Sequence, residues 1–350
     1  MTVLSVGLTA ALTLTACGSS SGAGGGDSAT VVFAGSGATI QKVLENEVFT
    51  EFTAKTGIKV TYQPGTAGQN LAKVQASASS PDIDVYFGNA ITHAQGTQMN
   101  LWDKIDPALV PSAKNTFPEV RTSDGFGVVF GQYMTGLEYN TKIFAEKGFA
   151  PPTSWKDLWD PAYRGHVALY DIAIGYTQDV LPHWAKAWDI DPSDTDALFE
   201  QVKKLKPQQV GIATAPPALA TLLQQEAAWI TYNSNLQVVQ NADSGVPVEF
   251  VTPVEGAIGF ENTLDVVKGA PHAENAQKLI DFMLGEDPQT VIAKKLTMAP
   301  VIPGLDLDAD TLKVTGYSPD APRSDVVPAM IDLEVANLKE WTDAWGEAFR

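Results

Sequence analysis

The chain has 350 residues, 44% of them hydrophobic, which is more than one hydrophobic core usually organises, so the length favours two lobes. Its formal net charge of -18 is scattered along the sequence, and the absence of basic clusters argues against nucleic acid as a partner. The single cysteine, Cys17, excludes an internal disulfide and a cysteine-built zinc site.

The amino-terminal segment has the features of an export and anchoring signal. Residues 3–16 carry no charge and match a signal-peptide apolar region in length, but they are too few to span a bilayer. They end in Leu14-Thr15-Ala16-Cys17, which resembles a bacterial lipobox, where the cysteine is acylated after cleavage. We therefore predict a signal peptide over 1–16, a lipid at Cys17 and a location outside the cytoplasm, anchored to the cell membrane. The Gly/Ser-rich residues 17–28 have the composition of a flexible tether.

From residue 29 onward, strand and helix patterns alternate. The β-branched and aromatic runs predict strands at 30–35, 57–63, 83–88, 128–140, 165–171, 210–214, 227–233 and within 247–260. Apolar residues at helical spacing predict helices near 40–55, 69–78, 92–99, 176–188, 195–205, 217–226 and 274–284, followed by closing helices. Alternation of this kind predicts an α/β fold in which each lobe is a mostly parallel sheet flanked by helices.

Several segments carry a resemblance to a known family. They are GIKVTYQ at 57–63, PTSWKDLWDPAYRG at 152–165, AAWITYNSN at 227–235, PVEGAIGFENTL at 253–264 and the helix ENAQKLIDFML at 274–284. In this order they resemble the spermidine/putrescine-type family of ABC-transporter solute-binding proteins. Within the second segment, Ser154 can cap a short helix whose Trp155, Leu158 and Trp159 share one face, so we interpret that motif as a core anchor.

The resemblance implies a two-lobed, type II periplasmic-binding fold. The chain would cross between lobes near 132–136, 259–262 and 300. Lobe 1 would then comprise 29–133 and 261–300, and lobe 2 would comprise 134–260 and 301–350. The implied partners are a small-molecule solute held between the lobes and an ABC permease in the membrane. The protein would act as a monomer without a cofactor and would not be an enzyme.

Candidate solute contacts in lobe 1 follow the ends of predicted strands, where open α/β sheets bind ligands. Ser36, Gly37 and Thr39 belong to a small-residue loop that opens a helix, and its free backbone N–H groups can hold a polar or anionic group. The alternative is a tight turn in which Ser36 or Thr39 merely caps the helix. The resemblance places Asn89 and Ala90 at a second contacting turn.

The remaining candidates lie in the crossings and lobe 2. Tyr133, in the first crossing, can form a hydrogen bond with a solute or act as a core tyrosine. The resemblance implies that Tyr232, followed by Asn233, and Phe260 supply aromatic contacts to an alkyl chain or ammonium, with core packing as the alternative for each ring.

The absence of certain carboxylates restricts the positive charge that the solute can carry. Asn262 stands where the family's cation binders carry an aspartate, and Asp171 stands beside their other acidic pair, where this chain has Ile172 and Gly175. A buried ammonium without carboxylate partners costs several kcal/mol. Glu255 could restore charge, whereas alternation along the strand predicts that Glu261 points away from the face used by Phe260. A monoamine, a zwitterion or a neutral polar solute therefore fits better than a dicationic polyamine.

Other functions remain open on the residues alone. A phosphonate or carboxylate could bind the amides of 35–39, and a surface lipoprotein that only adheres or signals needs no solute. A ferric site is disfavoured because no Tyr-Tyr pair occurs, only the run 232–235. A hydrolase lacks support because the four histidines are far apart and no HExxH, GxSxG, GxxxxGK[ST] or complete GxGxxG motif is present.

Overall fold

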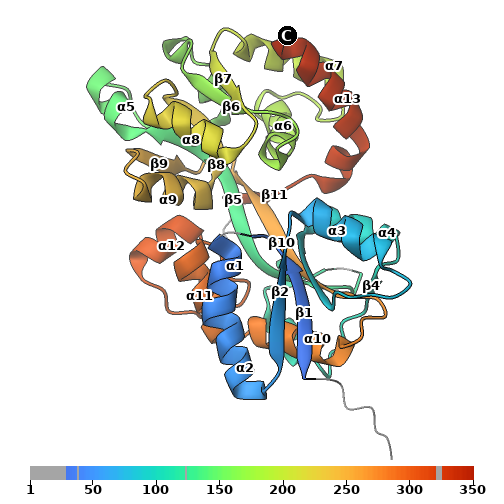
Figure 1. The fold of residues 1–350 in the computed structure, drawn as a ribbon. Helices are drawn as coiled ribbons and strands as arrows, with labels where there is room; N and C mark the ends of the chain where they lie inside the picture. The colour runs from blue at the N-terminus through green and yellow to red at the C-terminus, as the bar shows by residue number, and fades with distance from the viewer. Residues whose placement is uncertain (1–28, 38, 123, 321–324) are drawn as a thin grey trace, which may run out of the picture.

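The computed structural model describes residues 29–37, 39–122, 124–320 and 325–350. The predicted signal peptide, the tether and the lipidation site Cys17 lie outside these residues. The described chain forms two lobes, one above the other in Figure 1, joined by long strands. No helix in the described part is both long and apolar enough to cross a membrane.

One curled sheet runs through both lobes in the order β2-β1-β3-β10-β5-β8-β6-β7, with β4 and β11 beside β10 and β9 beside β5. The strands are β1 (Thr30–Gly35), β2 (Lys59–Pro64), β3 (Val85–Asn89), β4 (Trp102–Asp103), β5 (Val128–Asn140), β6 (Val167–Tyr170), β7 (Gln209–Ala213), β8 (Ile230–Ser234), β9 (Val248–Val251), β10 (Ala257–Val267) and β11 (Val326–Pro328). Each predicted strand is present within a few residues.

The sheet is mixed, which corrects the expectation of mostly parallel lobes. Parallel pairs occur only away from the centre, where β1 pairs with β2 and β3, and β6 pairs with β7 and β8, and in the short pair of β10 with β11. In the centre, β10 and β5 run antiparallel to each other, and β3 and β8 pair antiparallel with them. We call β5 and β10 the crossing strands, because both pass from one lobe to the other and they run in opposite directions.

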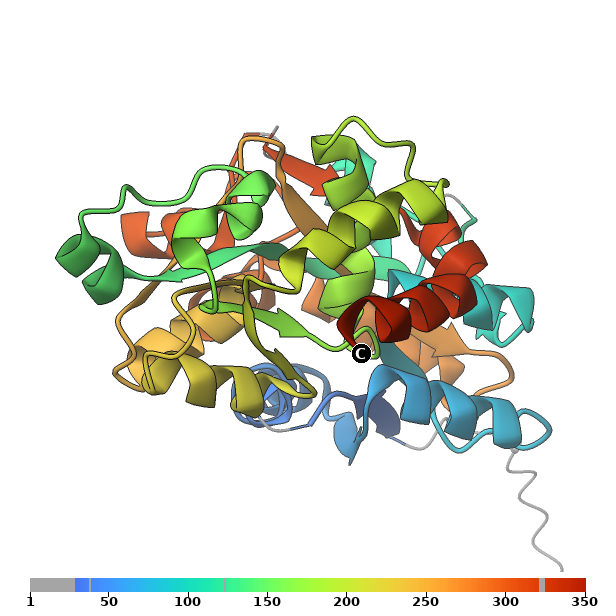
Figure 2. The same ribbon diagram turned by 90° about the horizontal axis from the view of Figure 1, so that it is seen from above.

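Helices flank this sheet. They are α1 (Thr39–Val43), a π-helical turn (Leu44–Phe49), α2 (Thr50–Thr56), α3 (Ala67–Ala76), α4 (Ala90–Gln98), α5 (Thr141–Lys147), α6 (Gly175–Ala187), α7 (Thr195–Val202), α8 (Pro216–Gln224), α9 (Asn235–Asp243), α10 (Ala273–Met283), α11 (Glu286–Leu296), α12 (Ala309–Thr315) and α13 (Ile331–Phe349). The C-terminal helix α13 packs on α6 and α7, as the view from above shows (Figure 2). Because α6 and α7 belong to the second lobe, α13 lies on that lobe.

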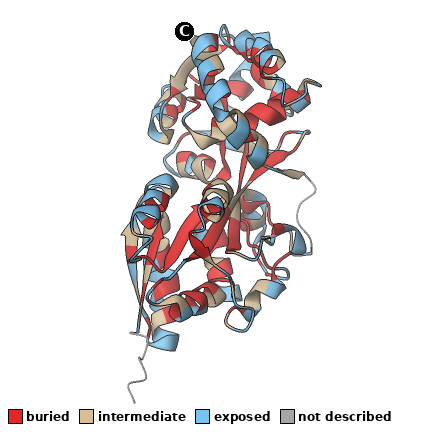
Figure 3. Cartoon of the chain, turned by 90° about the vertical axis from the view of Figure 1, so that its right-hand side faces the viewer, coloured by how far each residue is buried: buried red, intermediate tan, exposed pale blue. Residues whose placement is uncertain are grey.

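Two large hydrophobic cores define the lobes. The first core gathers residues such as Phe33, Phe87 and Ile280 from β1, β3 and α10. The second includes Trp184 and Trp341 from α6 and α13. Buried segments continue along the long strands between the lobes, while the outer helices turn exposed faces to solvent (Figure 3). The lobes therefore share their central strands instead of being separate sheets.

The segment after Pro300 differs from the expected division. Val301 and Tyr317 are part of the first core, so residues 301–317 stay with the first lobe. Beside them, Gln132 and Ala299 exchange backbone hydrogen bonds of 3.0 and 2.7 Å, so the chain near 300 lies along β5 without crossing. The third crossing falls between 317 and 326, and residues 321–324 lie outside the described part.

The motif at 153–159 is a core anchor, as predicted. Trp155 and Leu158 are fully buried, and the Ser154 Oγ accepts the Lys156 N–H at 3.1 Å to cap a 3-10 turn. The Glu255 carboxylate accepts hydrogen bonds from the Ser154 hydroxyl and from the Trp155 N–H. This carboxylate is therefore engaged in holding the anchor.

Candidate binding site at the crossing strands

The crossing strands present two different faces where the lobes meet. Residues paired in register share a face of a sheet, and so do residues two apart along a strand. Phe260 pairs with Tyr133, and Asn262 pairs with Asn89. Adding the pair formed by Thr135 and Ser234 on β5 and β8 gives one face. We call it the polar face, defined by Asn89, Tyr133, Thr135, Ser234, Phe260 and Asn262.

Three groups of the polar face are buried without a hydrogen-bond partner among the described residues. They are the Tyr133 hydroxyl, the Thr135 hydroxyl and the Asn262 Nδ2 amide. Leaving such a group unpaired costs about 1–3 kcal/mol, so native proteins keep few of them without a use. Burial raises the pKa of the Tyr133 phenol above its ordinary value, which keeps it a neutral hydrogen-bond donor. The face therefore offers unused hydrogen-bonding capacity at the boundary between lobes.

The second lobe contributes further groups next to this face. Tyr176, in the first turn of α6, donates its hydroxyl to Ser234 Oγ at 3.2 Å, so the start of α6 lies over the polar face. No side chain caps α6, whose N-cap residue is Ile174. Asp171, just after β6, is half-buried and accepts the Ala173 N–H at 2.9 Å. An uncapped helix start thus lies beside the hydroxyl and amide groups, and Asp171 belongs to the turn that leads into that helix.

The two predicted turns of the first lobe are well held. Asn89 Oδ1 accepts the Thr92 N–H at 2.9 Å, so its side chain caps α4, which begins at Ala90. The Ser36 carbonyl accepts the Tyr62 hydroxyl at 2.5 Å. Gly37 is half-buried. Thr39, the first residue of α1, is exposed, and the residue between these two lies outside the described part.

Tyr232 and Asn233 lie inside the second core. Tyr232 is fully buried, its hydroxyl lies 2.6 Å from Thr177 Oγ1, and its ring centroid is 5.4 Å from that of Trp184. Asn233 donates to the Glu138 carboxylate at 2.9 Å and accepts the Tyr170 hydroxyl at 3.2 Å. Both side chains therefore have the core-packing role that the sequence left open for Tyr232, and neither belongs to a surface that a solute can reach here.

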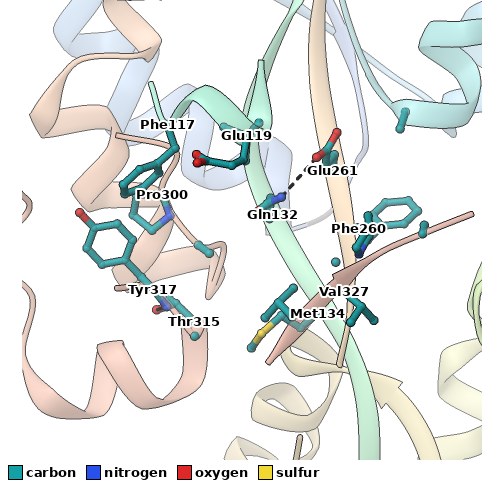
Figure 4. A pocket seen from close by; sticks show the side chains of 18 of the residues that line it. Phe117, Glu119, Gln132, Met134, Phe260, Glu261, Pro300, Thr315, Tyr317 and Val327 are labelled. Carbon is teal, nitrogen blue, oxygen red and sulfur yellow. Dashed lines mark hydrogen bonds between the residues drawn. The ribbon is translucent and has the colours of Figure 1, made fainter. Parts of the chain in front are cut away.

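The side of the crossing strands that carries Gln132, Met134 and Glu261 borders a cavity of about 270 Å³, and Phe260 of the polar face also lines it. Figure 4 shows Phe117, Pro300 and Tyr317 on one side and Val327 on the other. We call it the rear cavity, lined by Ala90, Ile91, Phe117, Glu119, Val120, Gln132, Met134, Gly259, Phe260, Glu261, Ala299, Pro300, Thr315, Gly316, Tyr317, Ser318, Val326, Val327, Pro328, Ala329 and Ile331.

The rear cavity contains one half-buried polar pair. Gln132 and Glu261 are partners in register, and the Gln132 amide donates to the Glu261 carboxylate at 3.4 Å. Burial raises the pKa of Glu261 above its ordinary value. The register confirms that Glu261 points away from the face that carries Phe260. Sequence reasoning did not anticipate a cavity here, although the same alternation that placed Glu261 could have paired it with Gln132.

Among the described residues, no group of three or more His, Cys, Asp or Glu side chains could hold a metal ion. His93 lies between two carboxylates, with Nδ1 2.6 Å from Asp265 and Nε2 3.2 Å from Asp124. Burial works to lower the pKa of His93, but the hydrogen bonds and charges of both aspartates raise it overall. This bracket joins α4 to β10 and serves the packing of the first lobe.

Comparisons with known proteins agree with this architecture. A crystal structure of an ABC transporter from Clostridium perfringens ATCC 13124 superposes with a TM-score of 0.79 at 21% identity, covering 91% of this chain and 100% of that chain. That likeness confirms the predicted two-lobed α/β fold. A spermidine/putrescine-binding periplasmic protein of Salmonella typhimurium (strain LT2) is 26% identical over 305 residues, which cover 85% of this chain and 83% of that protein.

A second relative is named for a different ligand. A candidate 2-aminoethylphosphonate-binding periplasmic protein of Salmonella typhi is 24% identical over 259 residues, covering 72% of each chain. The family model described as bacterial extracellular solute-binding protein matches residues 47–316, which is most of the chain. This protein therefore belongs to the bacterial extracellular solute-binding protein family, whose members serve transport and are not enzymes.

Proposed function

We propose that this chain is the solute-binding component of an ABC importer and that it holds one small polar organic molecule against the polar face, between its lobes. The observation that carries the proposal is the set of three buried, unpartnered groups on that face, from Tyr133, Thr135 and Asn262. Membership of the solute-binding family supports it. A solute that bonds groups on the shared strands and touches both lobes stabilises the closed arrangement.

The chemistry of the polar face favours an amine-bearing or zwitterionic solute. Its own hydrogen-bonding groups are hydroxyls and amides, and Asp171, in the turn that leads into α6, can supply one carboxylate. A dicationic polyamine would need more carboxylates than this, because each buried ammonium requires a partner. The two curated relatives carry names of ligands that share an amino group. A solute with one ammonium on Asp171 and hydrogen bonds to Tyr133 and Asn262 would fit both the single carboxylate and the amino group that the two named ligands share.

An anionic solute such as a phosphonate or carboxylate is the second candidate, on a specific observation. The start of α6 beside Tyr176 has no side-chain cap, and a helix start of this kind can hold an anion on its first free N–H groups. A zwitterion would use this helix start and Asp171 together. The solute panel below separates these possibilities.

The test is a thermal-shift and calorimetry screen against monoamines, ω-amino acids, polyamines, aminophosphonates and simple carboxylates. A solute present at 100 times its Kd adds about 2.7 kcal/mol to the stability of the protein. Tyr133→Phe should weaken the best solute about 2- to 10-fold, because it removes one hydrogen bond and keeps the ring. Tyr139→Phe, farther along the same strand, is the matched control and should leave affinity unchanged. A silent panel, or equal affinity in Tyr133→Phe, contradicts the proposal.

The proposal also includes a lipid anchor at Cys17 and a permease partner in the membrane. Fractionation of cells that express the full chain should place the protein with the membranes, and Cys17→Ser should release it. Mass spectrometry of the amino-terminal peptide should show an acylated cysteine. An unmodified Cys17 in a membrane-bound protein would overturn the anchor and leave solute binding untouched.

A further inference from the structure

A cavity of about 280 Å³ lies within the first lobe, apart from the polar face. Its described walls all come from residues 105–129, which include a 3-10 turn (Pro111–Asn115) and the start of β5. We call it the first-lobe cavity. Among the described lining residues, it shares none with the polar face and only Val120 with the rear cavity. Val129 stands four residues before Tyr133, about 13 Å along β5, so this cavity is separate from the proposed solute site.

The inner walls of the first-lobe cavity are apolar. Val110, Val128 and Val129 are buried and belong to the first core, and Ile105 and Ala113 pack against that core. Walls of this kind offer water few hydrogen bonds, and an apolar cavity of about 150 Å³ is enough to hold one benzene ring. The larger volume here therefore fits a ring with a short side chain.

The rim of the first-lobe cavity carries two cations. Lys114 and Arg121 line it and are both exposed, and none of the described lining residues is Asp or Glu. Although the chain has 41 acidic residues against 23 basic ones, no carboxylate of the described residues pairs with either side chain. The mouth of the cavity is therefore positively charged in a strongly acidic protein, and this suits an anion.

The Arg121 side chain is already held in position at the rim. Its Nε donates to Thr116 Oγ1 at 3.3 Å, and its Nη2 donates to the carbonyl oxygens of Lys114 at 2.7 Å and of Thr116 at 2.5 Å. Within the described chain its Nη1 donates to no acceptor, so those N–H groups are available to a carboxylate. A guanidinium fixed in this way loses little side-chain entropy when it binds.

We propose that the first-lobe cavity is a binding site for a small carboxylate with an apolar body, of the arylalkanoate class. The body lies against Val110, Val128 and Val129, and the carboxylate lies on Arg121 and Lys114. Because one lobe supplies every described wall, occupancy stabilises that lobe and leaves the angle between the lobes unchanged. The site goes beyond the proposed function and does not depend on it, since no group of the polar face takes part.

The test of the charged rim uses 3-phenylpropionate as the probe and isothermal calorimetry on the full chain carrying Cys17→Ser. The neutral amide of the same shape, 3-phenylpropionamide, should bind about tenfold more weakly, because it cannot pair with the cations. Arg121→Gln should weaken the probe by about the same factor. Arg164→Gln, at an exposed position in the second lobe, is the matched control and should leave affinity unchanged. Added salt should also weaken binding of the probe.

The test of the apolar walls fills the cavity and locates the probe. Ala113→Phe should abolish binding, while Ala336→Phe, at an exposed position on α13, should not. In methyl NMR spectra the signals of Val128 and Val129 should shift with the probe, and that of Thr135 on the polar face should stay in place. If Ala113→Phe fails to fold, Lys114→Gln replaces it, because the Lys114 ammonium forms no hydrogen bond within the described chain, and it should weaken the probe about threefold.

The outcomes distinguish this site from the proposed solute site. Equal affinity for the acid and the amide, or no binding at millimolar probe, would overturn the first-lobe site. Loss of probe binding in Tyr133→Phe, with Arg121→Gln unaffected, would place the probe on the polar face and overturn it as well. A silent solute panel together with binding that depends on Arg121 would overturn the proposed function and keep this site. The radius of gyration should be the same with and without saturating probe, and a more compact protein would contradict a site confined to one lobe.

Discussion

Asn235, at the start of α9 in the second lobe, donates its side-chain amide to the carbonyl oxygen of Thr297 in the first lobe at 2.9 Å. The same amide reaches the Val314 carbonyl at 2.8 Å, and its Oδ1 accepts the Met134 N–H of β5 at 3.1 Å. Asn235 is 1% exposed, so these three bonds have no water to replace them. One buried side chain therefore ties both lobes to a crossing strand.

Replacing that side chain should loosen the closed arrangement. Asn235→Ala removes all three of these hydrogen bonds, so we expect a loss of about 2–4 kcal/mol in the free energy of unfolding. The radius of gyration from X-ray scattering should also rise, because the link between the lobes is gone. Asn337→Ala, which removes only a local bond to Leu333 within α13, is the control. Equal scattering curves for both variants would contradict the role of Asn235.

Glu138 should make the protein less stable as the pH rises. Its carboxyl is fully buried, and burial raises its pKa from 4.5 to about 7, against the hydrogen bonds from Asn233 and Asn241 that favour ionisation. The folded state therefore holds a proton that the unfolded chain releases near pH 4.5. The free energy of unfolding therefore falls between about pH 4.5 and pH 7, by about 3 kcal/mol in all.

Urea unfolding of Glu138→Gln at pH 5 and pH 7.5 checks this expectation. The variant cannot ionise, so the difference in stability between the two pH values should shrink relative to wild type. Part of the slope should remain, because burial also raises the pKa of Asp179 and Glu334, which face each other on α6 and α13. Glu340→Gln, at an exposed position, should keep the full slope. An unchanged slope in Glu138→Gln would rule out the buried proton.

Two helical glycines should respond oppositely to alanine. A Cβ at Gly96 of α4 would collide with the ring of Trp102, whose Nε1 donates to the His93 carbonyl at 2.9 Å. Gly96→Ala should therefore cost about 1–3 kcal/mol. At Gly68 of α3 a Cβ would meet nothing within 4 Å, so Gly68→Ala should stabilise the protein by up to about 1 kcal/mol. Thermal denaturation of both variants measures this, and a neutral Gly96→Ala would show that Trp102 can move.

The sequence predicted the elements well because each has a strong local signal. The β-branched and aromatic runs of β1, β3 and β5 and the capped motif at Ser154 depend on neighbours along the chain. The placement of residues 301–317 depended instead on which core receives Val301 and Tyr317, and no local pattern encodes that choice.

The candidate site was predictable in part, for the same reason. Strand alternation correctly put Glu261 opposite the face of Phe260, and the crossing near Tyr133 was expected. The sequence left the role of Tyr232 open, because a tyrosine in this strand has the same local pattern whether its hydroxyl meets a solute or Thr177. The rear cavity needs walls from both lobes, and contacts so distant in sequence leave no trace in any one segment.

The shared strands also constrain the order of biosynthesis. The first core is complete only with Tyr317, and the second only with Ala348. A nascent polypeptide can therefore finish its first core only after Tyr317 has left the ribosome, and its second only after Ala348 has. Such a chain stays unfolded long enough to thread through a narrow translocation channel, which suits a family whose members work outside the cell.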